Sequence, residues 1–389
     1  MRVKFFIFLL ALLSVGMTAC SPDGKKGSGG GAYNDKELTG ERDSLRYARN
    51  LTLDRIGEGE NTIYVATVRN PWDTVKRMER YLLVPKGMDL PGDLPEGKVV
   101  RVPVNNALIY SSLHSGLVGD LGAGKAIGGV CNARYITDKE LSGRIARGEV
   151  TDCGEGMNPD MEKIIQLHPE VIMLSPFENN DRYAKVAQLG IPVIECADYM
   201  ETSPLGQAEW MKFYGLLFGK GDEARDRFNG IEKRYNDLKA QAARSEFKPK
   251  VLMDEVYSGS WSVPGGESTM GRLIEDAGGV NPFSGYRKSG GVSLAPEKVL
   301  MEAGDADVWL VRYNQKSEKT LPELSRDAPV NSQFKAFKRG EVYGCNTQYI
   351  PFFDETPFHP DLLLEDLSRI FRSVGGEEPE NTRYFRKMK

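Results

Sequence analysis

Residues 222–244 read DEARDRFNGIEKRYNDLKAQAAR, and this stretch decides the fold. Its apolar residues recur at steps of three and four, the spacing of an amphipathic helix. They are Ala224, Phe228, Ile231, Tyr235 and Leu238. At about 1.5 Å per residue such a helix is roughly 35 Å long, the width of a domain. A lone helix of this length between two other parts of a chain predicts a rigid connection between them.

Short apolar runs alternate with helical periods on both sides of this helix, which predicts βαβ units on parallel sheets. Expected strands lie at 126–130, 171–174, 191–195, 250–254, 306–311 and 341–343. Expected helices lie at 106–121, 162–168, 181–189, 204–218, 269–277, 332–338 and 361–371. We therefore predict an α/β fold of two Rossmann-like lobes with parallel sheets, joined by one long helix.

The N-terminal part has strand-like patterns instead, with a hairpin expected over 44–68 and further strands at 80–85 and 99–104. The chain is too long for one ordinary core. The predicted parts are a signal peptide (1–19), a tether (20–31), a β-rich extension (32–97), an N-terminal lobe (98–203), linking helices (204–245), a C-terminal lobe (246–374) and a frayed tail (375–389).

The first residues have the pattern of a secretory signal peptide. Arg2 and Lys4 precede an apolar run from Phe5 to Val15, which is shorter than the ~20 residues of a membrane-spanning helix. The sequence Met17-Thr-Ala-Cys20 then resembles a bacterial lipobox, although Leu is usual in place of Met17. We expect lipidation at Cys20 and a lipid-anchored protein of the periplasm or cell envelope. The alternative is a plain signal peptide.

Composition narrows the function classes. The net charge of −4 argues against a nucleic-acid-binding protein, because such proteins usually have an excess of basic residues. The three histidines, His114, His168 and His359, are too few for a typical transition-metal cage, so we expect no direct metal site. An envelope location permits disulfides, and Cys131 with Cys153 is the candidate pair. Buried free thiols are the alternative.

Two similar stretches occur, one in each predicted lobe. Residues 158–165 (NPDMEKII) and 294–300 (LAPEKVL) each combine a Pro near a helix start with a Glu-Lys pair, and each precedes a buried strand. Pro and Glu are ordinary in a first helical turn, so either copy alone says little. The repetition suggests two lobes built alike, with Glu162 and Glu297 at corresponding points.

With these features, residues 98–372 resemble the substrate-binding proteins of ABC importers that carry cobalamin, ferric siderophores or haem. The resemblance implies two lobes with a ligand cleft between them. It also implies that Glu162 and Glu297 dock on arginines of the permease, although extra residues between Asn158 and Glu162 depart from the usual motif. The extension at 32–97 resembles longer versions seen in Bacteroides-like bacteria.

Open α/β sheets bind ligands at the carboxyl ends of their strands. Aromatic and arginine side chains follow several of the expected strands, and they could wall a flat chelate and pair with its anionic groups. The candidate ligand-binding residues are Arg134, Tyr135, Phe177, Tyr257, Trp261, Arg312, Tyr313, Phe352 and Phe353. Singly, each aromatic could equally be a core residue. We expect Trp261 to stack on the ligand, because it lies in a Gly/Ser-rich loop (258–266) that offers little core.

The sequence thus predicts a monomeric binding lipoprotein, without an intrinsic cofactor, that delivers an iron or cobalt chelate to an importer permease. Two alternatives remain: a receptor for a bare divalent metal ion, and an envelope enzyme on the same fold. We find no G-x-S-x-G or H-E-x-x-H motif, and we expect no enzymatic activity. Which chelate is bound, and which membrane leaflet holds the anchor, stay open.

Overall fold

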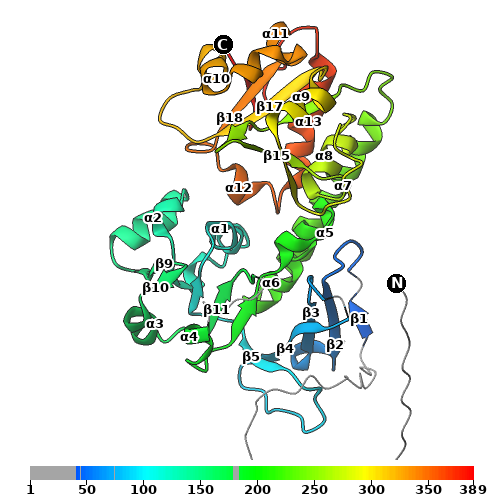
Figure 1. Ribbon diagram of the computed structural model, residues 1–389. Helices are drawn as coiled ribbons and strands as arrows, with labels where there is room; N and C mark the ends of the chain where they lie inside the picture. Colours follow the sequence, from blue (N-terminus) through cyan, green and yellow to red (C-terminus); the bar gives the residue numbers. More distant parts are fainter. Residues whose placement is uncertain (1–40, 44, 74, 178–183) are drawn as a thin grey trace, which may run out of the picture. The chain divides into compact units, whose positions relative to one another are not determined.

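The computed structural model describes residues 41–43, 45–73, 75–177 and 184–389 (Figure 1). The signal peptide, Cys20 and the tether lie outside these residues, so lipidation stays a prediction. The described residues belong to one compact unit.

The N-terminal extension and the first strand predicted for the N-terminal lobe together form a five-stranded sheet in the order β1-β2-β3-β4-β5. Its strands are β1 (Glu41–Asp43), β2 (Leu51–Ile56), β3 (Ile63–Arg69), β4 (Arg77–Pro85) and β5 (Lys98–Val102). The antiparallel pair β2–β3 confirms the predicted hairpin, while β4 and β5 run parallel.

The next part of the chain builds a parallel sheet in the order β12-β11-β6-β7-β8. Its strands are β6 (Ala107–Ile109), β7 (Ile127–Val130), β8 (Thr151–Asp152), β11 (Val171–Leu174) and β12 (Val193–Glu195). Its other elements are α1 (Ser112–Asp120), α2 (Lys139–Ala146), α3 (Met161–Leu167), α4 (Ala184–Ala187) and the hairpin β9 (Gly154–Glu155) with β10 (Asn158–Pro159).

The helix predicted over 106–121 is wrong in its first turn. Residues 107–109 form β6, which pairs with β7 on one side and with β11 on the other, and the helix begins only at Ser112. Three consecutive buried apolar residues suit a central strand of a parallel sheet, whose two faces are both covered.

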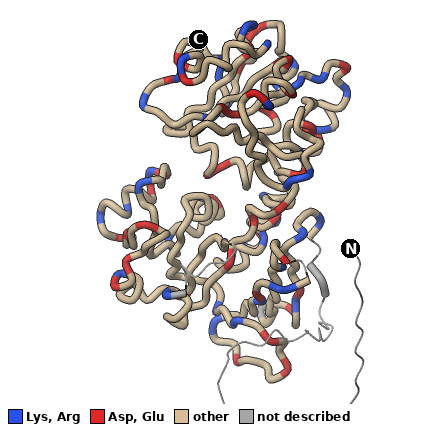
Figure 2. Tube along the Cα trace, viewed as in Figure 1, with Lys and Arg blue, Asp and Glu red and all other residues tan. Residues whose placement is uncertain are grey.

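Three helices follow: α5 (Pro204–Glu209), α6 (Met211–Leu217) and α7 (Gly221–Ala242). The single helix predicted over 204–218 is therefore two helices, which meet at Trp210. The long helix is confirmed as α7, which packs against α5, α6 and α13 (Pro360–Ser373). Four of its five predicted apolar positions are buried, and Leu238 is half-buried. Acidic and basic residues are interspersed along α7 as over the rest of the described chain (Figure 2).

The C-terminal part repeats the strand–helix alternation around a sheet in the order β13-β17-β18-β19. Its strands are β13 (Val251–Met253), β17 (Val308–Tyr313), β18 (Val342–Asn346) and β19 (Arg386–Lys387). A small antiparallel sheet holds β14 (Val256–Tyr257), β15 (Ser260–Pro264) and β16 (Gly291–Leu294). The remaining helices are α8 (Thr269–Asp276), α9 (Pro296–Ala303), α10 (Leu321–Asp327), α11 (Lys335–Arg339) and α12 (Phe352–Glu355).

The frayed tail predicted from Gly375 is wrong. Strand β19 pairs antiparallel with β18, and the preceding Tyr384 and Phe385 are fully buried. The buried carboxylate of Asp366 accepts hydrogen bonds from the backbone N–H groups of Arg383, Tyr384 and Phe385. The chain end is therefore an edge strand of the second sheet, because its aromatic residues complete the core.

We expect Phe385→Ala to lower the free energy of unfolding by about 3–5 kcal/mol, because it removes a fully buried ring. The exposed Lys389 is the matched control, and Lys389→Ala should cost less than about 0.5 kcal/mol. Urea denaturation of both variants measures the difference. Equal stability of the two variants would contradict the packing of the tail.

Candidate functional site

The carboxyl ends of β6, β7 and β11 surround a cavity of about 280 Å³. Because these strands are parallel and adjacent, the loops that follow them meet at one edge of the sheet. The lining residues are Tyr110, Ser111, Ser112, Asn132, Tyr135, Gly156, Met157, Ser175 and Phe177. The cavity is therefore built from strand ends and from the β9–β10 hairpin.

Asn132 connects these loops. Its backbone is left-handed (φ 56°), a conformation that Asn tolerates better than most residues. The side-chain oxygen accepts from the Gly156 N–H at 3.0 Å, and the side-chain nitrogen donates to the Tyr110 carbonyl at 3.4 Å. A Cβ at Gly156 would lie 2.8 Å from that nitrogen, so this close approach requires glycine.

Most strongly exposed aromatic side chains among the described residues follow the carboxyl ends of strands in two sheets. These are the β12-β11-β6-β7-β8 sheet, called the first sheet below, and the β13-β17-β18-β19 sheet, called the second sheet. Phe247, which lies between α7 and β13, is the exception. The residues at strand ends are Tyr135, Phe177, Tyr199, Tyr257, Tyr349 and Phe353, with exposed fractions from 39% to 84%. Leaving rings in water forgoes their burial energy, so their grouping on this side of the sheets makes it a candidate binding surface.

In the second sheet, Arg312 at the end of β17 forms two hydrogen bonds to Asp254, at 2.9 Å and 2.6 Å. Its guanidinium carbon lies 5.3 Å from the ring centres of both Phe352 and Phe353. Arg312 is thus held in place with its charge paired. It can orient Phe353, but an anionic ligand group would compete with Asp254 for it.

Polar contacts join α1 to the region of α12 and α13. The Ser112 hydroxyl donates to the Asp354 carboxylate at 2.6 Å, and His359 Nε2 lies 3.5 Å from an oxygen of Asp120. Burial raises the pKa of Asp354, while its hydrogen bonds to Ser112 and Thr137 oppose this shift. Ser112 also lines the cavity, so the cavity wall is tied to the second half of the chain.

Arg134, Tyr135 and Phe177 lie where the sequence analysis expects ligand contacts, at strand ends of the first sheet. Tyr135 and Phe177 line the cavity. Arg134 is largely exposed, forms an ion pair with Glu155 at 3.1 Å and lies 4.7 Å over the Tyr135 ring. Exposed ion pairs of this kind are weak, so Arg134 can exchange Glu155 for another anion. From the second half of the chain, Tyr257 and Phe353 are exposed at strand ends.

Trp261 does not lie on this surface, so the prediction that it stacks on a ligand is wrong. The stretch expected as a glycine-rich loop contains strand β15, and Trp261 is fully buried between Trp309 and Phe334. Its indole N–H donates to the Met253 carbonyl at 2.9 Å. The ring is a core residue whose polar atom is already satisfied.

The predictions that Tyr313 and Phe352 bind the ligand are wrong for the same reason, because both rings are buried. Tyr313 is only 8% exposed, and its hydroxyl donates to Glu318. Phe352 is 2% exposed and packs edge-on against Tyr384 and Phe385. Neither ring has a face left for a ligand.

The structure also differs from the candidate disulfide between Cys131 and Cys153, because it leaves both cysteines free. The four cysteines of the described residues are buried free thiols. Burial raises the pKa of the Cys131 thiol well above its usual range, and it raises the pKa of Cys153 to about 11. Both thiols pack in one apolar cluster with Leu108 and with Tyr110, which also lines the cavity.

Glu162 and Glu297 occupy equivalent helix positions. Each is the second residue of its helix, α3 or α9, and each side chain is exposed. The helix starts differ, because Asp160 caps α3 whereas Pro296 opens α9. The paired acids of the sequence analysis are therefore at matching positions, and the extra residues of the first motif form β10 and the cap.

Sequence reasoning missed Met157, Ser111 and Tyr349. Ser111 was hidden by the helix expected over 106–121, and a strand ending at Ile109 would have revealed it. Met157 and Tyr349 lie in short turns without a motif of their own. Among the described residues, we find no group of three His, Cys, Asp or Glu side chains placed to hold a metal ion. None of the helices in that part of the chain is long and apolar enough to cross a membrane.

A family model described as periplasmic binding protein matches residues 110–349. An uncharacterized lipoprotein of Methanocaldococcus jannaschii is 28% identical over 329 residues, or 78% of this chain and 77% of that protein. The petrobactin-binding protein of Bacillus subtilis is 28% identical over 151 residues, or 38% of this chain and 45% of that protein.

Solved structures resemble the fold. A periplasmic heme binding protein of Pseudomonas aeruginosa has a TM-score of 0.56 at 17% identity, covering 73% of this chain and 98% of that chain. A periplasmic vitamin B12 binding protein of Vibrio cholerae has a TM-score of 0.50 at 18% identity, covering 71% of this chain and 99% of that chain. This likeness confirms the predicted α/β fold class.

We expect Trp261→Ala to lower the free energy of unfolding by about 3–5 kcal/mol, because it empties a fully buried site and leaves the Met253 carbonyl without its donor. Tyr257→Ala, four residues earlier and 84% exposed, should leave stability within about 0.5 kcal/mol. Thermal or urea unfolding measures both variants. A stable Trp261→Ala protein would return this residue to the candidate surface.

Proposed function

The chain belongs to the periplasmic binding protein family, and we propose that it captures a metal chelate and delivers it to an ABC importer. The observation that carries the proposal is the set of exposed aromatic side chains at strand ends, two of which, Tyr135 and Phe177, line the cavity. The proteins with which it shares sequence or fold include proteins named as binders of petrobactin, haem and vitamin B12.

The chemistry of the surface suits a chelate with flat, conjugated parts. Tyr135 and Phe177 supply ring faces in the first sheet, and Tyr257 and Phe353 supply them in the second. Rings of this kind stack on planar groups and exclude water from them. Arg134 supplies a cation that can leave Glu155 for a carboxylate, phosphate or catecholate of the ligand. A chelate brings its own metal ligands, so the protein need only recognise its organic periphery.

The proposal includes a lipid anchor at Cys20 and a position in the cell envelope. Relatives named as lipoproteins support it. The anchored protein would present Glu162 and Glu297 to the permease, since both carboxylates are exposed in the first turn of their helices. Charge pairs of this kind steer association and set its register more than they add affinity.

We expect haemin, cobalamin or a ferric catecholate siderophore to bind the purified protein, with a shift in the absorbance of the chelate. Tyr135→Ala and Phe177→Ala should each weaken that binding about five- to a hundredfold, or about 1–3 kcal/mol, because each removes a ring face from the ligand.

Phe247→Ala is the matched control, because Phe247 is 51% exposed but lies away from the strand ends. Its affinity should equal that of the wild type. Binding of none of the three chelates would refute the chelate-receptor proposal. Binding of a bare divalent ion, or turnover of a chelate, would favour the corresponding alternative.

We expect the double variant Glu162→Gln and Glu297→Gln to fold and bind the chelate normally, because exposed charges at helix starts contribute about 1 kcal/mol or less. Chelate uptake by cells should fall, since two charge pairs with the permease are lost. Glu377→Gln with Glu378→Gln, two exposed acids of the tail, is the control. Normal uptake by the first variant would rule out the docking role.

A further inference from the structure

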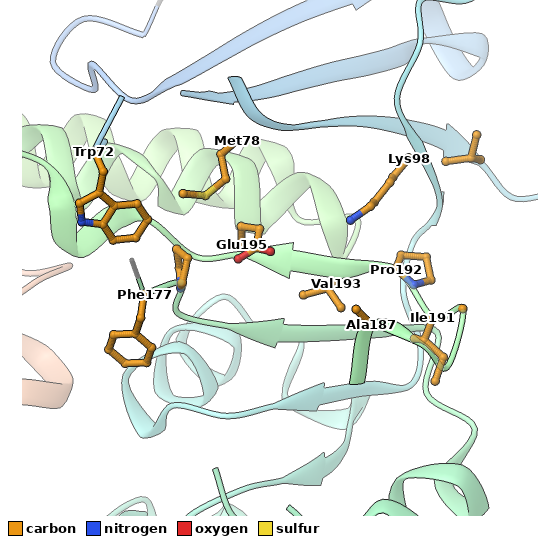
Figure 3. A pocket seen from close by; sticks show the side chains of 12 residues that line it. Trp72, Met78, Lys98, Phe177, Ala187, Ile191, Pro192, Val193 and Glu195 are labelled. Atoms are coloured by element: carbon orange, nitrogen blue, oxygen red, sulfur yellow. The ribbon is translucent and has the colours of Figure 1, made fainter. Parts of the chain in front are cut away.

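A second and larger cavity, of about 580 Å³, lies between the N-terminal sheet and the edge of the first parallel sheet (Figure 3). On one side, residues of β4 and β5 and the side chain of Trp72 line the cavity. On the other side, the lining comes from β12 and from residues between β11 and β12. The lining residues are Trp72, Met78, Lys98, Val99, Pro176, Phe177, Ala187, Gly190, Ile191, Pro192, Val193 and Glu195. Of these residues, the chelate-receptor proposal uses Phe177 alone.

Two of these described lining side chains are charged, Lys98 and Glu195, and they differ in their partners. Lys98 forms an ion pair with Glu79 at 2.6 Å. The Glu195 carboxylate forms no hydrogen bond or ion pair with any described residue, although its backbone N–H donates to the Tyr81 hydroxyl at 2.8 Å. When Glu195 is ionised, Lys98, Glu79 and Glu195 together carry one net negative charge. The other described lining residues are uncharged, and most of them are apolar.

The close-up in Figure 3 shows how the polar and aromatic groups are arranged. The rings of Trp72 and Phe177 lie toward one end of the cavity, Lys98 lies toward the other, and the Glu195 carboxyl is between them. A cation near such rings is attracted by their faces, and a carboxylate in an apolar wall gains most from a charged donor. The ring faces and the carboxylate therefore both favour a positively charged ligand.

We propose that this cavity binds a small organic cation, an apolar molecule that carries one protonated amine, with the amine on the Glu195 carboxylate and the apolar part against Trp72 and Phe177. The volume is within the range of small-molecule sites. The site is separate from the strand-end cavity, so the proposal holds whether or not the chain binds a chelate. Phe177 lines both cavities and would let an occupant of one contact the other.

The charge state of Glu195 makes the proposal testable by pH. Burial raises the pKa of the Glu195 carboxyl to about 7, while the Lys98 charge lowers it and the Glu79 charge raises it. Above this pKa the carboxylate is ionised and attracts the amine, whereas below it the neutral acid does not. Affinity for an amine that stays protonated should therefore rise about tenfold from about pH 6 to about pH 8.

Tryptophan fluorescence provides a local signal. The chain has four tryptophans. Trp210, Trp261 and Trp309 are fully buried, so Trp72 is the tryptophan that a ligand in this cavity touches. Phenethylamine is the probe, and 2-phenylethanol, of nearly the same shape without charge, is its control. At about pH 8 we expect saturable quenching, with the amine binding about tenfold more tightly than the alcohol.

Glu195→Gln should remove both the preference for the amine and its pH dependence, while the alcohol binds as before. Glu79→Gln is a second variant outside the cavity lining. This change frees Lys98 to pair with Glu195. It should therefore weaken binding of the amine but leave binding of the alcohol unchanged. The proposal is overturned if the amine does not quench, if amine and alcohol bind equally in the wild type, or if the pH dependence survives in Glu195→Gln. Circular dichroism confirms that each variant is folded.

Discussion

The described structure depends on the burial of one face of α7. Phe228, Ile231 and Tyr235 of this face belong to a core cluster that also contains residues of the N-terminal sheet, of the first parallel sheet and of α13. Burying three large side chains of this kind stabilises the fold by several kcal/mol, at about 1.5–3 kcal/mol each. Polar contacts from the C-terminal half of α7 then add to this packing. Arg234 pairs with Glu365 on α13, and the Tyr235 hydroxyl donates to Asp276 at the end of α8.

Two buried carboxylates attach the N-terminal sheet to this helical core. Glu209 accepts from the backbone N–H groups of Arg46, Tyr47 and Ala48, and Glu201 accepts from those of Arg49 and Asn50. Burial raises the pKa of Glu201, and these hydrogen bonds oppose the shift. A buried carboxylate without such donors would be costly, so segment 46–50 and the two acids need each other.

Tyr81 makes the second attachment. Its hydroxyl donates to the Val193 carbonyl and accepts from the Glu195 N–H, two backbone groups of the edge strand β12. A single side chain thus occupies part of a sheet edge that would otherwise expose unpaired groups. Because the contact is one hydroxyl rather than a paired strand, space remains beside it, and the larger cavity lies there.

Local periodicity and short motifs are enough to predict the alternation of strands and helices, the buried face of α7 and the family. They also predict that aromatic residues follow the strands. Which of these aromatic residues reach solvent depends on tertiary packing. Tyr257 and Trp261 both lie in the β14–β15 hairpin, yet the first is exposed and the second is buried. Alternate residues of a strand point to opposite faces, and only the packing of β15 against β13 and α9 decides which face is the core. Likewise, the tail, the free thiols and the carboxyl of Glu195 acquire their roles from neighbours distant in the chain, which no local pattern encodes.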